Sequence, residues 1–396
     1  MSTSKPIWDR GDAIDPEMLA FTIGDDWLMD RRLVEHDVRG SVAHVDGLER
    51  VHLVTPAEAE AIRVGLRTIV DEFRAGTFTV TPSDEDVHSA VERRLIELTG
   101  DAGKKLHTGR SRNEQVTVDV RLWLRDAIQA TRDAAVAVAR SASELAQRMG
   151  SVPLPGYTHL RRAMPSSLGD FARAHARAFA DCVDDLELAT RRVRFCPLGS
   201  GAGYGVPIAL DRAFVAQRLG FDGPDEPVTH VQLARGRAEL AYVTALESIA
   251  LAVGRFAADV WLFTTDEFAF AHLPVELTTG SSMMPQKRNP DVVELLRAHA
   301  RQVVAERDQL REVTRDLPSG YHRDFQLLKG PLFRAHDRVT AMLPLVARLF
   351  DRIEWNETRL REVASDPKLA ATARALEQAK AGVPFRDAYR SESRRG

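Results

Sequence analysis

The sequence is poor in the features that mark secreted, membrane-bound and nucleic-acid-binding proteins. Its 396 residues include two cysteines, Cys182 and Cys196, which are too few for a disulfide framework and have no metal-ligand spacing. The first residues contain no apolar stretch of a secretory signal, and we expect no segment long and apolar enough to cross a bilayer. A formal net charge of −3 gives no sign of a nucleic-acid or membrane partner. We therefore expect a cytoplasmic protein.

The alternation of polar and apolar residues that indicates half-buried strands is also missing. Residues 114–148 contain neither proline nor glycine, and Val116, Val120, Leu124 and Ile128 recur every four residues, as on one face of a helix. A helix of about 35 residues is about 50 Å long. Four further long helices are expected at residues 166–195, 229–265, 290–317 and 331–354. Successive long helices indicate an all-α bundle.

Shorter helices are expected nearer the N-terminus, at residues 30–50 and 56–75, with Pro56 in a first turn and Gly76 as a stop signal. We expect three parts in the chain: an N-terminal helical domain at residues 1–107, a central long-helix bundle at 108–354, and a short C-terminal helical region at 355–396. The segment 229–265 is apolar on nearly every side. Either neighbouring helices of the same chain or a second chain could cover it.

Residues 280–290 read Gly-Ser-Ser-Met-Met-Pro-Gln-Lys-Arg-Asn-Pro. Glycine and serine favour a mobile loop, while Asn289 suits an N-cap and Pro290 a first helical turn. The loop would end at the positive end of a helix dipole beside Lys287, which favours bound negative charge. Ser281 lies in no Gly-x-Ser-x-Gly turn, so a hydrolase nucleophile is poorly supported, whereas a serine that acts as a base needs nearby positive charge. A well-capped surface loop is the alternative.

Two other stretches carry clustered polar side chains. Residues 107–113 read His-Thr-Gly-Arg-Ser-Arg-Asn directly before the first long helix. Arginines beside a helix N-terminus form a good carboxylate site, and a solvated basic turn is the alternative. Residues 84–88 read Asp-Glu-Asp-Val-His, a spacing that fits no tetrahedral zinc site. We predict no metal.

These stretches resemble the signature segments of one enzyme superfamily. Residues 280–290 are similar to the G-S-S-x-M-P-x-K-x-N loop of the fumarase/aspartase superfamily. Residues 107–113 and 84–88, together with Pro-Gly-Tyr-Thr-His at 155–159 and Tyr-His-Arg-Asp-Phe-Gln at 321–326, resemble its argininosuccinate lyase branch. The resemblance covers nearly the whole chain. It implies an all-α fold of long helices, with the central helices forming the core of a homotetramer.

The resemblance also implies roles for individual residues. Ser281 would be the base that removes a proton from carbon, and Lys287 and Asn289 would stabilise the substrate carboxylate. His159, paired with Glu294, would be the candidate acid for the leaving nitrogen, although a lone histidine is more often structural. The other substrate-binding positions implied are Asp30, His88, Ser111, Arg112, Asn113, Thr158, Tyr321, Gln326 and Lys329.

The reaction that the resemblance implies is β-elimination of L-argininosuccinate to L-arginine and fumarate, with no cofactor. The alternatives are a lyase for another N-substituted aspartate and an inactive homologue kept as a structural protein. The candidate residues lie at the ends of different long helices, and helices about 50 Å long cannot bring all their ends together. We therefore expect active sites shared between subunits, in the homotetramer that the resemblance implies.

Two segments depart from the branch. Family members carry Ser-Asp-Arg-Asp-Phe where residues 234–238 read Ala-Arg-Gly-Arg-Ala, and a family serine is replaced around Asp26. A glycine inside a helix costs about 1 kcal/mol relative to alanine, so Gly236 needs a reason such as close approach of a neighbour. We expect Arg235 or, in particular, Arg237 to replace the missing guanidinium. The alternative is that both arginines are solvated or paired with acidic neighbours.

Overall fold

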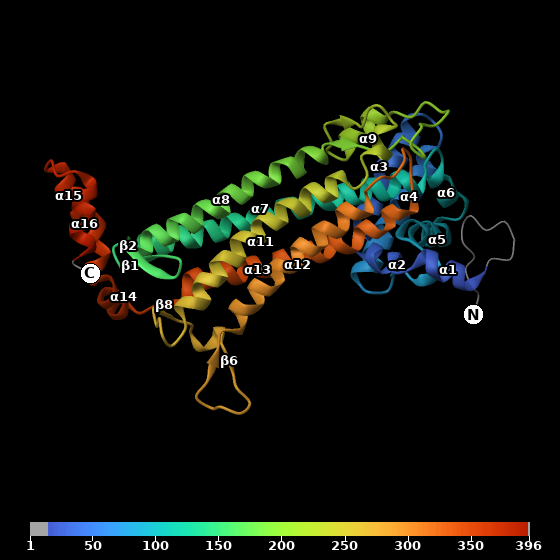
Figure 1. Ribbon diagram of the computed structural model, residues 1–396. Coiled ribbons are helices and arrows are strands. Elements are labelled where there is room, and N and C mark those ends of the chain that lie inside the picture. Colours follow the sequence, from blue (N-terminus) through green and yellow to red (C-terminus); the bar gives the residue numbers. More distant parts are fainter. Residues whose placement is uncertain (1–14, 395–396) are drawn as a thin grey trace. The chain divides into compact units, whose positions relative to one another are not determined.

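The computed structural model describes residues 15–394, which form two compact units. Unit 1 contains residues 15–130, 186–246 and 304–337, and unit 2 contains residues 131–185, 247–303 and 338–394. The unit boundaries fall within five long helices (Figure 1), which are α7 (Arg112–Arg148), α8 (Leu168–Arg192), α11 (Arg237–Phe263), α12 (Asp291–Val313) and α13 (Lys329–Arg352). The three domains expected from the sequence were consecutive stretches of the chain, whereas each of these units combines several separate stretches. The three-part division stays a prediction.

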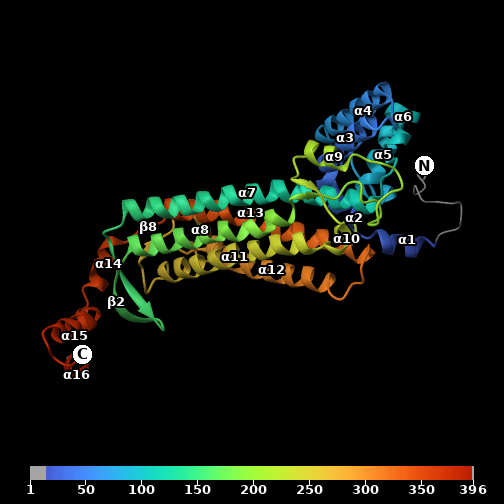
Figure 2. The ribbon, with the colours of Figure 1, turned by 90° about the horizontal axis from the view of Figure 1, so that it is seen from above.

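Unit 1 contains most of the shorter helices, several of which gather around α3 and α4 (Figure 2). Its α-helices are α1 (Pro16–Ile23), α2 (Asp26–Asp30), α3 (Val34–Arg50), α4 (Pro56–Arg74), α5 (Val87–Thr99), α6 (Asp101–Lys104), α9 (Arg212–Arg218) and α10 (His230–Leu233). Its 3-10 helices and strands are η1 (Arg31–Leu33), η2 (Pro82–Asp84), η3 (Lys105–His107), η5 (Arg323–Leu328), β3 (Phe195–Cys196) and β4 (Gly223–Pro224).

Unit 2 adds short strands and a C-terminal group of helices to its segments of the long helices. Its strands are β1 (Pro153–Thr158), β2 (Arg161–Ser167), β5 (Ala271–His272), β6 (Thr279–Gly280), β7 (Arg288–Asn289) and β8 (Glu354–Trp355). Its other helices are η4 (Val275–Leu277), α14 (Glu357–Ala364), η6 (Pro367–Ala370), α15 (Ala371–Lys380) and α16 (Phe385–Ser393). The pairs β1–β2, β5–β8 and β6–β7 are antiparallel, and β3–β4 in unit 1 is parallel.

The expected all-α architecture is confirmed, because the strands between residues 15 and 394 form only these two-stranded pairs. The local signals also act as expected. Pro56 begins α4, and Thr55 and Glu58 exchange hydrogen bonds with each other's backbone N–H in a capping box. The proline- and glycine-free stretch forms α7, which at 37 residues is about 55 Å long.

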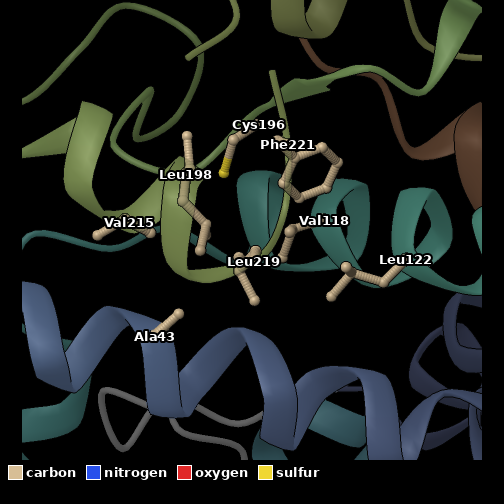
Figure 3. Close-up of a cluster of buried hydrophobic side chains, with 9 residues drawn as sticks. Ala43, Val118, Leu122, Cys196, Leu198, Val215, Leu219 and Phe221 are labelled. Atoms are coloured by element: carbon tan, nitrogen blue, oxygen red, sulfur yellow. The ribbon is translucent and has the colours of Figure 1, made fainter. Parts of the chain in front are cut away.

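Each unit has its own apolar core. In unit 1, one cluster joins α3, α7, α9 and the residues on either side of α9 (Figure 3). It contains Ala43, Val118, Leu122, Cys196, Leu198, Val215, Ala216, Leu219 and Phe221. In unit 2, Phe256 of α11 stacks on Phe350 of α13 with ring centroids 4.1 Å apart. Both cysteines are free and buried, and burial raises the pKa of the Cys196 thiol to about 12, which makes it a packing residue.

The segment 229–265 is not one helix, which corrects our placement of Gly236 within a helix. The chain leaves α10 at Leu233, turns through Gly236 at φ +81°, and starts α11 at Arg237. Only glycine adopts this φ without strain, and a Cβ here would lie 2.1 Å from Cγ2 of Thr314. The glycine is therefore required by a turn and by the close approach of α12's C-terminal end.

One other local expectation was wrong, and one local structure was not expected. Asn289 is not the N-cap of α12, because it pairs in β7 with Thr279, and the Pro290 carbonyl accepts the first helical hydrogen bonds. The hairpin that carries Thr158 and His159 was not expected from the sequence. Thr158 ends β1, and His159 and Leu160 form a two-residue hairpin turn with φ of +53° and +56°. The prolines in this hairpin argue against strands in the sequence.

One described segment has the length and mean hydropathy of a membrane span, contrary to our expectation. Within residues 230–263, a window of 18 residues has a mean hydropathy of 1.4, and 56% of this window is buried inside the protein. The core helix of a soluble protein has the same properties, so this single segment is weak evidence for a membrane.

The turn at Gly236 provides a test of the fold. We expect Gly236→Ala to lower the free energy of unfolding by about 2–4 kcal/mol, because it adds both φ strain and a clash with Thr314. Gly223→Ala is the matched control, since its φ is not positive and its Cβ would meet no atom within 4 Å. Urea unfolding of both variants measures the difference. Equal stability of the two variants would contradict the packing described here.

Candidate functional site

Unit 1 contains an open cavity of about 370 Å³ whose walls carry charges of both signs. Five segments form it: the end of α1 with α2, the start of α5, the start of α7, the turn between α10 and α11, and the connection from α12 to α13. Its lining residues are Ile23, Asp26, Asp30, Glu85, Asp86, His88, His107, Arg112, Asn113, Val116, Arg235, Tyr321, Arg323, Phe325, Gln326 and Lys329. Seven of the predicted substrate-binding residues are among them.

The N-terminus of α7 opens into this cavity. Arg112 and Asn113 are its first two residues and line the wall, while Ser111 caps the helix by accepting a hydrogen bond from the Asn113 N–H at 3.3 Å. Nη1 of Arg112 donates to Asp86 at 3.0 Å, which holds the guanidinium beside the opening. The positive end of the helix dipole and an arginine beside it together favour a bound carboxylate. Ser111 itself does not line the cavity.

Asp30 and Lys329 form a buried ion pair at the bottom of the site. The Lys329 ammonium also lies 2.6 Å from Asp26, so two carboxylates share one cation. Burial alone would lower the pKa of Lys329, but Asp30 and Asp26 outweigh it and raise that pKa. Burial raises the pKa of Asp26 to about 6, opposed by Lys329. The predicted binding residues Asp30 and Lys329 thus also link α2 to α13.

His88 lies at the centre of a second group of buried charged side chains. Its Nδ1 donates to Asp37 at 2.6 Å and lies 3.6 Å from Asp119, and all three side chains are buried. Burial would lower the pKa of His88, but the hydrogen bond to Asp37 and that carboxylate's charge raise it on balance. Burial and the nearby Asp37 also raise the pKa of Asp119 well above its usual range.

The same three side chains could in principle hold a metal ion, since their ligand atoms lie within 4.8 Å of one another. A histidine ligand must bind through a deprotonated nitrogen. Nδ1 of His88 instead carries the proton that it donates to Asp37. The arrangement is that of a histidine hydrogen-bonded to a carboxylate, and the absence of a metal remains a prediction.

The connection between α12 and α13 supplies the last wall. Tyr321 lines the cavity at its edge, and Nε2 of Gln326 donates to the carbonyls of Thr22 and Ile23 at 3.1 and 2.8 Å. Gln326 therefore holds the C-terminal end of α1 in place. Nε of Arg323 donates to the other end of the Gln326 amide at 3.1 Å.

Glu114 ties the start of α7 to the glycine-rich segment after β3. It accepts the backbone N–H of Gly201 at 2.7 Å and that of Ser111 at 3.2 Å, and its side chain is fully buried. Burial raises the pKa of Glu114 to about 7, although these N–H groups oppose the shift.

The predicted catalytic residues lie in unit 2. The β6–β7 loop projects from the start of α12 (Figure 1), with Ser281 at its beginning. The Ser281 hydroxyl accepts N–H donors from Met283 at 3.3 Å and Met284 at 3.0 Å. Lys287 is exposed, and between residues 15 and 394 its ammonium makes no hydrogen bond or ion pair. Asn289 donates weakly to the Gly280 carbonyl at 3.5 Å.

His159 and Glu294 also belong to unit 2, and both are exposed. His159 lies with Thr158 at the tip of the β1–β2 hairpin, and Glu294 lies in the first turn of α12. Within the described part of the chain, no ion pair joins them. Their pairing therefore remains a prediction.

Comparison with known proteins decides the family. A family model described as "Lyase" matches residues 10–305. An argininosuccinate lyase from Sorangium cellulosum is 44% identical over 384 residues, covering 97% of this chain and 89% of that protein. One from Xanthomonas oryzae pv. oryzae is 43% identical over 390 residues, with the same coverage. The chain belongs to the argininosuccinate lyase family. It is accordingly an enzyme of the lyase class.

Solved structures share the family's fold at lower identity. EDDS lyase in complex with formate matches with a TM-score of 0.79 at 23% identity, over 96% of this chain and 76% of that one. A class II fumarase from Schistosoma mansoni matches with a TM-score of 0.77 at 16% identity, over 93% and 90% of the two chains. These similarities establish the architecture of long helices.

Several residues of the site were missed in the sequence. Asp37 and Asp119 stand behind His88, and Arg235 lines the cavity where Arg237 was favoured. Asp119 had a signal, because it lies three residues after Val116 and next to Val120 on the predicted buried face of the helix. A charged residue on such a face needs a partner. Asp37 had no comparable signal.

Glu114 gives a pH-dependent prediction. Because its pKa in the folded state is raised, the native protein binds this proton more tightly than the unfolded chain does. Its contribution to stability is full below about pH 4.5 and is lost as the pH rises to about 7, by about 3 kcal/mol in all. Glu114→Gln cannot ionise, so urea midpoints from pH 5 to 8 should fall less for the variant than for the wild type. Parallel curves would contradict the assignment.

Proposed function

We propose that the protein eliminates L-arginine from L-argininosuccinate and releases fumarate, as the names of its relatives indicate for those proteins. The observation that carries this proposal is the unit 1 cavity. It gathers residues from five distant segments into one space lined by both carboxylates and cations. A substrate with carboxylates, an ammonium and a guanidinium needs both kinds of partner. The reaction needs no cofactor.

In the proposed mechanism, Ser281 removes the proton next to one carboxylate of the substrate. The backbone N–H groups of Met283 and Met284 already point at its hydroxyl and would stabilise negative charge on that oxygen. The unpaired Lys287 ammonium and Asn289 would hold the carboxylate that takes up charge. The carbon–nitrogen bond then breaks as a proton reaches the leaving nitrogen, for which His159 is the proposed donor.

We also propose a cytoplasmic homotetramer in which each active site draws on more than one chain. None of the residues assigned to proton transfer lines the unit 1 cavity. In addition, α11 presents Leu251 (57% exposed) and Trp261 (38% exposed) on its uncovered side. Apolar side chains on an otherwise buried helix suit contact with another helix of the same kind. Such contacts would bring unit 2 of one chain to unit 1 of another.

A second candidate is elimination from a different N-substituted aspartate. Two departures from the family favour this alternative: the replacement of a family serine around Asp26, and the Arg235-Gly236-Arg237 segment. Both lie where the proposed site would bind the leaving amino acid.

The proposal is tested by the release of fumarate, followed by its ultraviolet absorbance. The purified wild type should release fumarate from argininosuccinate, and Ser281→Ala should lower kcat by at least about 1,000-fold while binding the substrate, because only the base is removed. Ser282→Ala, a neighbouring exposed serine, is the matched control and should retain most activity.

Two results would overturn these assignments. Full turnover by a folded Ser281→Ala protein would show that another group is the base. Absence of fumarate release by the wild type from argininosuccinate would overturn the substrate, and absence with every N-substituted aspartate would indicate an inactive homologue.

A further inference from the structure

Arg235 is a buried cation on the wall of the unit 1 cavity. It follows α10 and precedes the Gly236 turn, and it is 6% exposed. It lines the cavity together with Tyr321 and Phe325. Arg237, two residues later, is exposed and does not line this cavity. The structure therefore favours Arg235 over Arg237 as the replacement for the guanidinium that the family carries at position 236.

The guanidinium of Arg235 has few partners for so buried a group. Nη1 donates to the Thr117 hydroxyl at 3.3 Å, and Nε lies 4.0 Å from the Glu239 carboxylate, too far for a hydrogen bond. Nε is buried without any acceptor. A guanidinium has five N–H donors, and no other hydrogen bond from it occurs in the described part of the chain. Burial accordingly lowers the pKa of Arg235, opposed mainly by Glu239.

The other buried or half-buried cations of the cavity are already neutralised. Lys329 contacts Asp30 and Asp26, and Arg112 contacts Asp86 and Glu85. Arg323 also lines the cavity but is exposed to solvent. Arg235 is thus the buried cation of this wall with the greatest remaining capacity for an anionic ligand.

Packing fixes where that charge lies. The Cζ atom of Arg235 lies over the Phe325 ring, 5.1 Å from its centroid, and the Gly236 turn lies so close to Thr314 that a Cβ would not fit there. A planar guanidinium held on an aromatic face keeps its edge free for two parallel hydrogen bonds to a carboxylate. The carboxylates of Asp26 and Asp30 in the same cavity suit an ammonium group.

We propose that Arg235 binds the α-carboxylate of the amino acid that leaves in the elimination, and thereby selects substrates whose leaving amine carries a carboxylate. This inference rests on the proposed function. Arg235 is a specificity residue in this account and takes no part in proton transfer. The leaving amino acid then contacts a cation through its carboxylate and the acidic residues through its α-amino group.

The test compares two substrates that differ only in this carboxylate: argininosuccinate and its analogue with agmatine in place of arginine. The wild type should prefer argininosuccinate by at least about 10-fold in kcat/KM. Arg235→Gln should raise the KM for argininosuccinate by about 10- to 100-fold, change kcat less than about threefold, and leave the analogue's kcat/KM nearly unchanged. Arg237→Gln is the matched control and should behave as the wild type.

The substrate comparison separates binding from a purely structural role. If Arg235 only supports the fold, Arg235→Gln will weaken both substrates equally, and the proposal is wrong. A wild type that accepts both substrates equally also overturns the proposal, whether or not the variant folds.

If Arg235→Gln does not fold, Arg235→Lys keeps the charge but loses the paired donors. It should retain turnover and lose most of the preference, and an unchanged preference contradicts the proposal. A wild type that releases no fumarate from argininosuccinate overturns the proposed function and this inference with it.

Discussion

Buried carboxylates around the unit 1 cavity impose the constraint on which its architecture depends. An ionised carboxylate away from water is stable only with a positive or hydrogen-bonding partner. Lys329 meets this need for Asp30 and Asp26, and His88 meets it for Asp37. The Asp30–Lys329 pair joins positions 299 residues apart in the chain, so satisfying the charge also places α2 against α13. The same pairs that stabilise unit 1 therefore preorganise its cavity.

This pairing leaves the cavity with groups that are held in place but not all neutralised. The N-terminus of α7 and Arg235 offer positive potential, while the acidic residues of α2 and of the segment before α5 offer the opposite sign. Because these groups do not need to reorganise when a ligand binds, an ionic substrate gains their attraction at low entropic cost. The β6–β7 loop follows the same logic, since its backbone donors already point at Ser281.

The fold was largely predictable because helix signals are local. The long proline- and glycine-free stretch, Pro56 in a first turn and the four-residue spacing of Val116 and Val120 all led to the observed helices. Gly236 was misplaced because its requirement comes from Thr314, just after the end of α12, which no local pattern contains. The hairpin at His159 was missed because its prolines argue against strands.

Site residues were predictable where they lie in signature stretches, and hidden where tertiary contacts create them. Seven predicted binding residues do meet in one cavity, whereas Ser111 serves as a cap and Thr158 and Asn289 lie in unit 2. Asp37 and Asp119 become important only through their contact with His88. Arg235 was distinguished from Arg237 only by burial, because the Gly236 turn ends the helical spacing that the sequence suggested.

The central proposal is that a unit 1 cavity and a unit 2 loop from different chains form one active site. It is tested most directly by mixing Ser281→Ala chains with Asn113→Ala chains in equal amounts, with subunit exchange allowed. A site that takes its cavity from the first chain and its loop from the second is intact, so activity should rise to about one quarter of the wild type. If the mixture stays at the average of the two unmixed variants, each site is built within a single chain and the account is wrong.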